Sequence, residues 1–145
     1  MKVVQPMSWQ EAYSNGLPLM DQTHQGFIEH FNAVLAASKN EQMAAFIELI
    51  EHTELHFDQE NQWMSAIPDF PACHRAEHDR VLEVLLEIKK RTEKGDQHLF
   101  QTLIKELPLW FENHVNGMDA ALAFHMSNIG FDPTQTSKNP SASKY

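Results

Sequence analysis

His74-Arg75-Ala76-Glu77-His78 is the stretch from which the fold and the candidate site of this chain can be worked out. On an α-helix, side chains four residues apart project from the same face, about one turn apart. Two imidazoles at this spacing can therefore bind the same metal ion. Such pairs are also common on solvated helix faces, so the interpretation as a metal site needs further ligands elsewhere in the chain.

Three other segments supply such ligands. His56 and Glu60 repeat the four-residue spacing, His114 and Asp119 lie five residues apart, and His24 stands alone near the beginning. Together the four segments offer five imidazoles and two carboxylates, which is more than one ordinary metal ion takes. The candidate metal ligands are His24, His56, Glu60, His74, His78, His114 and Asp119.

The size and charge of the chain limit what it can be. With 145 residues, 42% of them hydrophobic, it can build the core of one domain. The formal net charge of −9 argues against nucleic acid or an anionic membrane as a partner, because both require a basic surface. An acidic surface is typical of a monomer or a weak oligomer.

The sequence also bears on the compartment. It has no apolar run of about 18 residues that could span a bilayer, and its N-terminus lacks the apolar core of a signal peptide. Its single cysteine, Cys73, has no internal partner for a disulfide, which fits a reducing compartment. We therefore expect a cytoplasmic protein.

Apolar residues recur at helical spacing in four segments, over residues 20–35, 43–64, 74–88 and 100–122. Asp21, Asn40 and Asp96 are candidate caps for the first, second and fourth helices. Four amphipathic helices joined by short turns predict an all-α, up-down-up-down four-helix bundle with the ligands projecting into its core.

The regions outside the helices predict the domain limits. Residues 1–19 show no sustained period and are expected to form an irregular arm whose aromatic residues pack on the bundle. The bundle should occupy residues 20–128. Residues 129–145 have too little apolar content to fold, so we expect a disordered tail that could dock an unidentified protein partner.

Two features of the last helix depart from regularity. Pro108 leaves the carbonyl of Ile104 without a donor and should kink the helix. His114 and Asp119 would lie about 140° apart around a regular helix. A bulge or a long reach is therefore needed to bring both side chains to one site.

The remaining histidines have no role in this scheme. Around the axis of its helix, His52 is rotated roughly 40° further toward solvent than the candidate ligands His56 and Glu60. We expect it at the surface, together with His30, His98 and His125.

The complete ligand pattern resembles the hemerythrin family, specifically its single-domain bacterial members. Residues about 9–122 carry the resemblance, and every ligand position of the family is filled. Supporting motifs agree with the family pattern: Met20-Asp21-x-x-His24, Phe57 after His56, Met64 four residues after Glu60, and Trp110-Phe111-x-x-His114. Asn61 and Leu122 depart from it, standing where Glu and Tyr are common.

The resemblance implies a non-haem di-iron centre that binds O2 reversibly. By carry-over, His74, His78 and His114 bind one iron, His24 and His56 bind the other, and Glu60 and Asp119 bridge the two beside an oxo or hydroxo group. One coordination position then stays open for O2, on the iron with two histidines. The apolar pocket around it should include Phe27, Phe57, Trp110, Phe111 and Val115.

Other functions are compatible with the same ligand pattern. The same centre could serve a di-iron oxidase or peroxidase, a nitric oxide scavenger or a sensor, although no substrate channel, electron route or output domain is visible. Zinc fits poorly because it takes four ligands. A hydrolase using Cys73 and His74 fails because neighbouring residues on a helix do not face each other. A metal-free bundle would bury the cluster at high cost.

Overall fold

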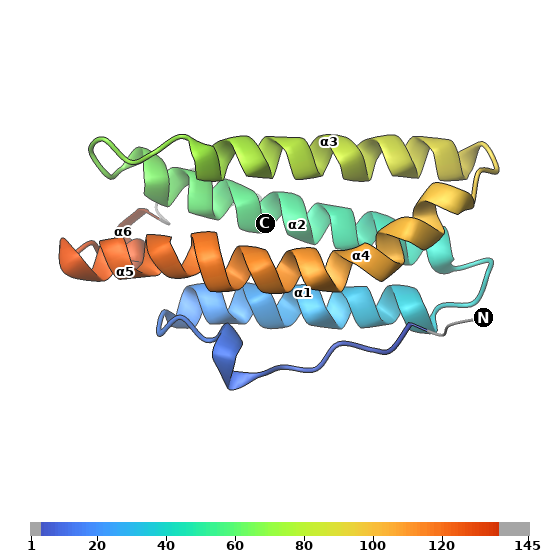
Figure 1. The fold of residues 1–145 in the computed structure, drawn as a ribbon, viewed down its shortest axis with the longest axis horizontal. Coiled ribbons are helices and arrows are strands. Elements are labelled where there is room, and N and C mark those ends of the chain that lie inside the picture. The colour runs from blue at the N-terminus through green and yellow to red at the C-terminus, as the bar shows by residue number, and fades with distance from the viewer. Residues whose placement is uncertain (1–3, 137–145) are drawn as a thin grey trace.

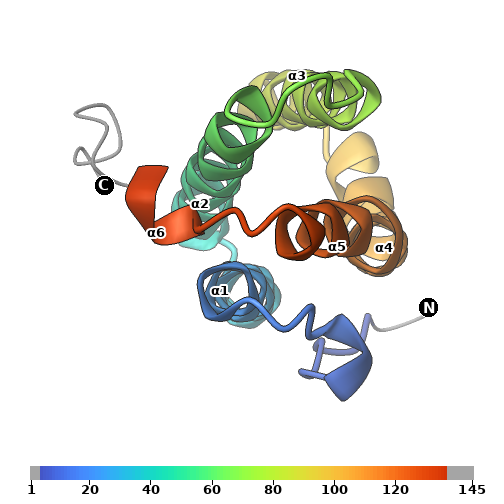
Figure 2. The same cartoon turned by 90° about the vertical axis from the view of Figure 1, so that its left-hand side faces the viewer.

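The computed structural model describes residues 4–136. Four long helical segments form an up-down-up-down bundle, and no strand occurs within these residues (Figures 1 and 2). The all-α bundle expected from the sequence is confirmed. Its elements are η1 (Glu11–Tyr13), α1 (Pro18–Ala36), α2 (Gln42–Ser65), α3 (Cys73–Glu93), α4 (His98–His114), η2 (Val115–Asp119), α5 (Ala120–Asn128) and α6 (Pro133–Thr136).

The fourth rod of the bundle consists of three elements. α4, η2 and α5 follow one another without a break, and η2 is a π-helical segment. Pro108 lies inside α4, and Figure 1 shows the axis of α4 changing direction along its length, as the missing N–H of a proline favours.

Two of the three expected helix caps, Asp21 and Asn40, are wrong. Pro18 opens α1, where its missing N–H costs nothing, while the carboxylate of Asp21 accepts hydrogen bonds from Ser14 Oγ and Asn15 N at 2.7 and 2.9 Å. Asp21 thus fixes the arm and does not cap the helix. Asn40 does not cap either, since α2 begins after Glu41 without a side-chain cap.

The turn between α3 and α4 follows the expected pattern more closely. Gly95 has φ of +100°, and the N–H of Asp96 reaches the carbonyl of Arg91 at 3.0 Å, which closes the end of α3. The carboxylate of Asp96 accepts the backbone N–H of His98, the first residue of α4, at 3.0 Å.

Two apolar clusters fill the bundle, one toward each end. The larger includes Phe31, Phe46 and Phe100, and the smaller includes Trp63 and Met126. The candidate ligands of α1, α2 and the fourth rod lie in sequence between residues of the two clusters. The candidate site therefore sits inside the bundle with apolar packing on both sides.

The arm packs on the bundle through aromatic side chains. Tyr13 is buried, with its ring 5.4 Å from that of Phe111 and 5.8 Å from that of Trp9. The backbone of Met7 is held by the side-chain amide of Asn32 on α1 through two hydrogen bonds.

The segment expected to be a disordered tail is described as far as residue 136. There α6 lies against α2, and the indole N–H of Trp63 donates to the carbonyl of Pro133 at 3.3 Å. The expectation for residues 137–145 falls outside the described residues. Within residues 4–136, no helix combines the length and the apolar character needed to cross a membrane.

Candidate metal centre

All seven candidate ligands lie in the interior of the bundle. Each is at most 4% exposed, although they come from α1, α2, α3, α4 and η2. Burying so many ionisable groups is costly unless they compensate one another or bind cations. The structure thus brings together all the residues His24, His56, Glu60, His74, His78, His114 and Asp119.

The π-helical segment η2 explains how Asp119 joins the cluster. His114 ends α4 and Asp119 ends η2, five residues later. A π-helix closes its hydrogen bonds between residues i and i+5, so residues at that spacing lie nearly above one another. His114 Nε2 and Asp119 Oδ1 are accordingly 3.1 Å apart. The bulge expected from the spacing is present.

The carboxylate of Glu60 faces histidines on two sides. Its Oε2 lies 2.6 Å from His56 Nε2. Its Oε1 lies 3.3 Å from His74 Nε2 and 3.2 Å from His78 Nε2. Each oxygen therefore belongs to a different group of imidazoles.

Asp119 repeats this arrangement. Its Oδ2 lies 2.8 Å from His24 Nε2, whereas its Oδ1 lies 3.0 Å from His74 Nε2 and 3.1 Å from His114 Nε2. Two sets of ligand atoms result, each with its atoms within 4.8 Å of one another, and both carboxylates belong to both sets. The sets are Glu60, His74, His78, His114 and Asp119, and His24, His56, Glu60 and Asp119.

Several ligand atoms in the cluster are buried without a hydrogen-bond partner. They include Nε2 of His74, His78 and His114, and one oxygen of each carboxylate. The atoms are close but poorly aligned for hydrogen bonds, and a buried polar atom without a partner typically costs 1–3 kcal/mol. Converging nitrogen and carboxylate lone pairs of this kind fit divalent or trivalent transition-metal ions.

Contacts with the carboxylates outweigh burial and raise the pKa of His56, His74 and His114, whereas burial prevails at His78 and lowers its pKa. Burial disfavours the charged form of His74, yet the carboxylates of Asp119 and Glu60 raise the pKa of His74 to about 9. Burial likewise disfavours the anion of Asp119, but His114, His24 and His74 hold the pKa of Asp119 well below its usual range. Without metal, protons on the imidazoles therefore balance the two carboxylates.

Two side chains outside the cluster orient the imidazoles of His78 and His114. Glu77 Oε2 lies 2.8 Å from His114 Nδ1, and Asn61 Oδ1 lies 2.9 Å from His78 Nδ1. Each oxygen accepts the Nδ1 proton, which leaves Nε2 to face the centre. Asn61, a departure from the hemerythrin pattern in the sequence, thus still supplies an acceptor. Glu77 was not predicted as a functional residue, although it lies between His74 and His78 in the sequence.

Aromatic side chains surround the imidazoles. Phe57 stacks on His78 with centroids 3.9 Å apart, and Trp110 stacks on His114 at 4.8 Å. The ring of Phe111 meets His24 edge-on at 5.7 Å. The remaining two residues expected around an O2 pocket are buried: Phe27 stacks on Phe111, and Val115 follows His114. Trp110, in contrast, is only partly buried.

The other four histidines do not enter the cluster, and two are not simple surface residues. His98 and His125 are exposed, as expected. His52 and His30 are half-buried between α1 and α2, with ring centroids 4.9 Å apart. The ring of His52 is drawn inward because Gly26 leaves room for it.

Comparison with known proteins agrees with this geometry. Residues 15–123 match the family described as the hemerythrin HHE cation binding domain. A bacteriohemerythrin of Ralstonia nicotianae is 41% identical over 134 residues, covering 91% of this chain and 95% of the relative. A bacteriohemerythrin of Stenotrophomonas maltophilia is 30% identical over 79% of this chain and 78% of its own. One from Methylococcus capsulatus is 24% identical over 78% and 91%.

Proposed function

The chain belongs to the hemerythrin family, and on this premise we propose that it holds two iron ions in the buried cluster and binds O2 reversibly there. One observation carries the proposal. Glu60 and Asp119 each direct one oxygen to each of two groups of imidazoles, which is the arrangement that two bridging carboxylates need. A site for a single ion gives no reason for this division.

The proposal assigns every ligand. One iron takes the three imidazoles of His74, His78 and His114, and the other takes those of His24 and His56. If both carboxylates were shared by the two ions, the iron held by His24 and His56 would have one protein ligand fewer than the other, and O2 would bind there.

The iron pair, when bound, supplies the electrons that O2 takes up reversibly. The chain itself orients the imidazoles and keeps water out of the centre. Asn61 and Glu77 hold two imidazoles in the tautomer that presents Nε2. Phe111, Phe27 and Val115, each at most 3% exposed, would exclude water and hence protons from the centre, and Phe111 does so directly beside His24.

The ligand composition favours binding over oxidation. Oxygen-activating di-iron bundles use carboxylate-rich sites, whereas five of the seven ligands proposed here are neutral imidazoles when they bind metal. Highly oxidised iron receives less charge compensation in such a site. A di-iron oxidase or peroxidase, a nitric oxide scavenger and a sensor are the alternative functions. The proposal includes a cytoplasmic location and no catalytic turnover.

The test is a spectroscopic cycle on the full iron-loaded chain. The protein is reduced without air, and its visible spectrum is recorded before air, after air and after degassing. A coloured oxygenated form that disappears on degassing and returns with air supports a reversible carrier. Rapid and irreversible oxidation would refute reversible binding and favour the redox or sensor functions. His98→Ala serves as the matched control, and His56→Ala should lose the cycle.

A further inference from the structure

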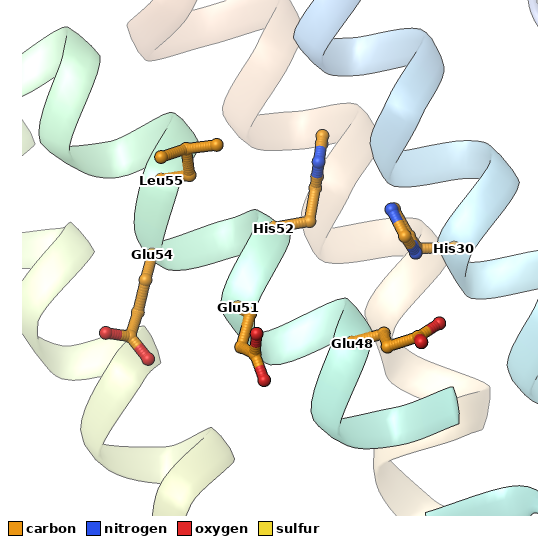
Figure 3. Close-up of a pocket in the computed structure, with 6 residues that line it drawn as sticks. All are labelled: His30, Glu48, Glu51, His52, Glu54 and Leu55. Atoms are coloured by element: carbon orange, nitrogen blue, oxygen red, sulfur yellow. The ribbon is translucent and has the colours of Figure 1, made fainter. Parts of the chain in front are cut away.

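A second group of metal-ligating side chains lies on the outside of the bundle, in a pocket of about 510 Å³ between α1 and α2. Figure 3 shows its lining, in which His30 of α1 faces α2 and the other residues come from α2. The lining residues are His30, Glu48, Glu51, His52, Glu54 and Leu55. None of these residues belongs to the buried centre.

The ring of His52 is held in one tautomer. Its Nε2 lies 2.9 Å from the carbonyl oxygen of Thr23. Because a carbonyl can only accept, Nε2 carries the proton and Nδ1 keeps its lone pair. Metal-binding histidines characteristically donate their second ring N–H to a carbonyl or carboxylate in this way. Burial also lowers the pKa of His52, which keeps its imidazole neutral and able to bind a cation.

Gly26 makes the position of this ring possible. A Cβ at residue 26 would lie 2.5 Å from His52 Cε1 and 2.9 Å from His52 Nε2. Any other residue there would therefore push the ring away from Thr23. The glycine lets α1 approach α2 closely enough for the hydrogen bond to form.

His30 and the glutamates complete the surroundings. The rings of His30 and His52 are 4.9 Å apart and inclined by 36°. In Figure 3 Glu48 points toward the side of His30, whereas Glu51 and Glu54 point away from the histidine pair. The lining carries three carboxylates and no lysine or arginine, so its electrostatic potential attracts cations.

We propose that His30 and His52, assisted by Glu48, form an accessory site for one divalent transition-metal ion of the Cu²⁺, Ni²⁺ or Zn²⁺ type. Imidazole nitrogen with a carboxylate is the donor set that these ions prefer. Within the described residues, three ligand side chains converge within 4.8 Å only in the buried centre. The accessory ion is therefore held first by the two imidazoles, with water and the exposed, flexible carboxylate of Glu48 completing its coordination.

An ion at this place would link the helices that carry one half of the buried centre. Thr23 directly precedes His24 on α1, and His52 lies one turn before His56 on α2. Joining His30 to His52 through a metal ion would hold these two helices together. We expect binding to raise the melting temperature without changing the iron content.

The test uses Cu²⁺ as the probe, added to the iron-loaded full chain and followed by electron paramagnetic resonance. The expected result is one Cu²⁺ per chain with coupling to two imidazole nitrogens, while metal analysis shows unchanged iron. The number of bound Cu²⁺ ions is compared between variants, so the result does not depend on what the buried centre holds. His98→Ala, at an exposed histidine elsewhere, should behave as the unchanged chain does.

Three variants decide the outcome. His30→Ala and His52→Ala should each abolish the two-nitrogen copper signal. Gly26→Ala keeps both histidines but displaces the ring of His52, and it should weaken copper binding roughly 10- to 100-fold. Far-UV circular dichroism checks that each variant is folded. Retention of the signal in both histidine variants, or binding of copper only by displacement of iron, would overturn the proposal.

Discussion

Glu60 and Asp119 lie in the same buried cluster, and each gives one carboxylate oxygen to each of two histidine groups. Glu60 Oε2 lies 2.6 Å from His56, and Asp119 Oδ2 lies 2.8 Å from His24. Their other oxygens both approach His74, at 3.3 and 3.0 Å. This division of oxygens carries the proposal of two ions.

Asp119→Asn should abolish binding of the iron pair. The amide oxygen can serve one ion, but the NH₂ group donates protons and cannot bind the second. Metal analysis should find at most one iron per chain in place of two. Asp58→Asn, at an exposed carboxylate of α2, is the control and should keep both ions. Two tightly held irons in Asp119→Asn would contradict the bridging role.

Glu77→Gln should weaken iron binding without removing a ligand. The carboxylate accepts the Nδ1 proton of His114 at 2.8 Å, and it makes the imidazole a stronger donor to metal. Replacing its charge should lower iron affinity roughly 10- to 100-fold and shift the reduction potential of the centre. Glu83→Gln, an exposed change on the same helix, should do neither. An unchanged potential and affinity would show that the contact is only structural.

The metal-free protein should lose stability as the pH rises from about 6.5 to 9. The folded chain raises the pKa of His74 from 6.5 to about 9, so the proton on His74 stabilises the folded state. This contribution is complete below pH 6.5 and disappears above pH 9, and it amounts to roughly 3 kcal/mol. Neighbouring His114 also has a raised pKa and acts in the same direction.

The loss of stability between pH 6.5 and 9 can be assigned to the histidines of the cluster. Glu60 and Asp119 have lowered pKa values, so both carboxylates stay ionised across this range and add no pH dependence. Urea unfolding of chelated protein at several pH values measures the effect. Iron-loaded protein should not lose stability as the pH rises, because coordinated imidazoles bind no proton on Nε2. Equal stability of the chelated protein at pH 6.5 and 9 would count against the cluster as described.

Val115→Thr should shorten the lifetime of the oxygenated protein. Val115 is fully buried beside His114, and a hydroxyl group there brings a proton donor into a dry pocket. Faster autoxidation in air is expected, and Phe27 replaced by a polar residue should act in the same direction. Val84→Thr, a comparable change at an exposed position of α3, is the control. If the oxygenated forms of Val115→Thr and the unchanged protein had equal lifetimes, Val115 would not act by keeping water out.

The sequence predicted the bundle and the convergence of the cluster because both depend on local spacing. Four apolar stripes of helical period require four helices around one core. The five-residue step from His114 to Asp119 predicted a bulge or a long reach, and η2 provides the bulge as a π-helix. Gly117 lies within this segment, where its low helix propensity reduces the cost of an irregular turn.

Features that depend on contacts between helices were missed. The hydrogen bond between Glu77 and His114 joins residues 37 positions apart on α3 and α4. The burial of His52 depends on the missing Cβ of Gly26 on another helix. Asp21 was expected to cap α1, but it binds the arm instead because Pro18 begins the helix three residues earlier. Spacing within one helix does not encode such contacts.

A crystal structure of the iron-loaded protein, with anomalous scattering recorded at the iron absorption edge, would locate the ions directly. We expect two peaks, one beside His24 and His56 and one beside His74, His78 and His114. Glu60 and Asp119 should each bind both ions. A single peak, or two peaks without the shared carboxylates, would contradict the central claim that this bundle is built to hold a bridged pair of irons.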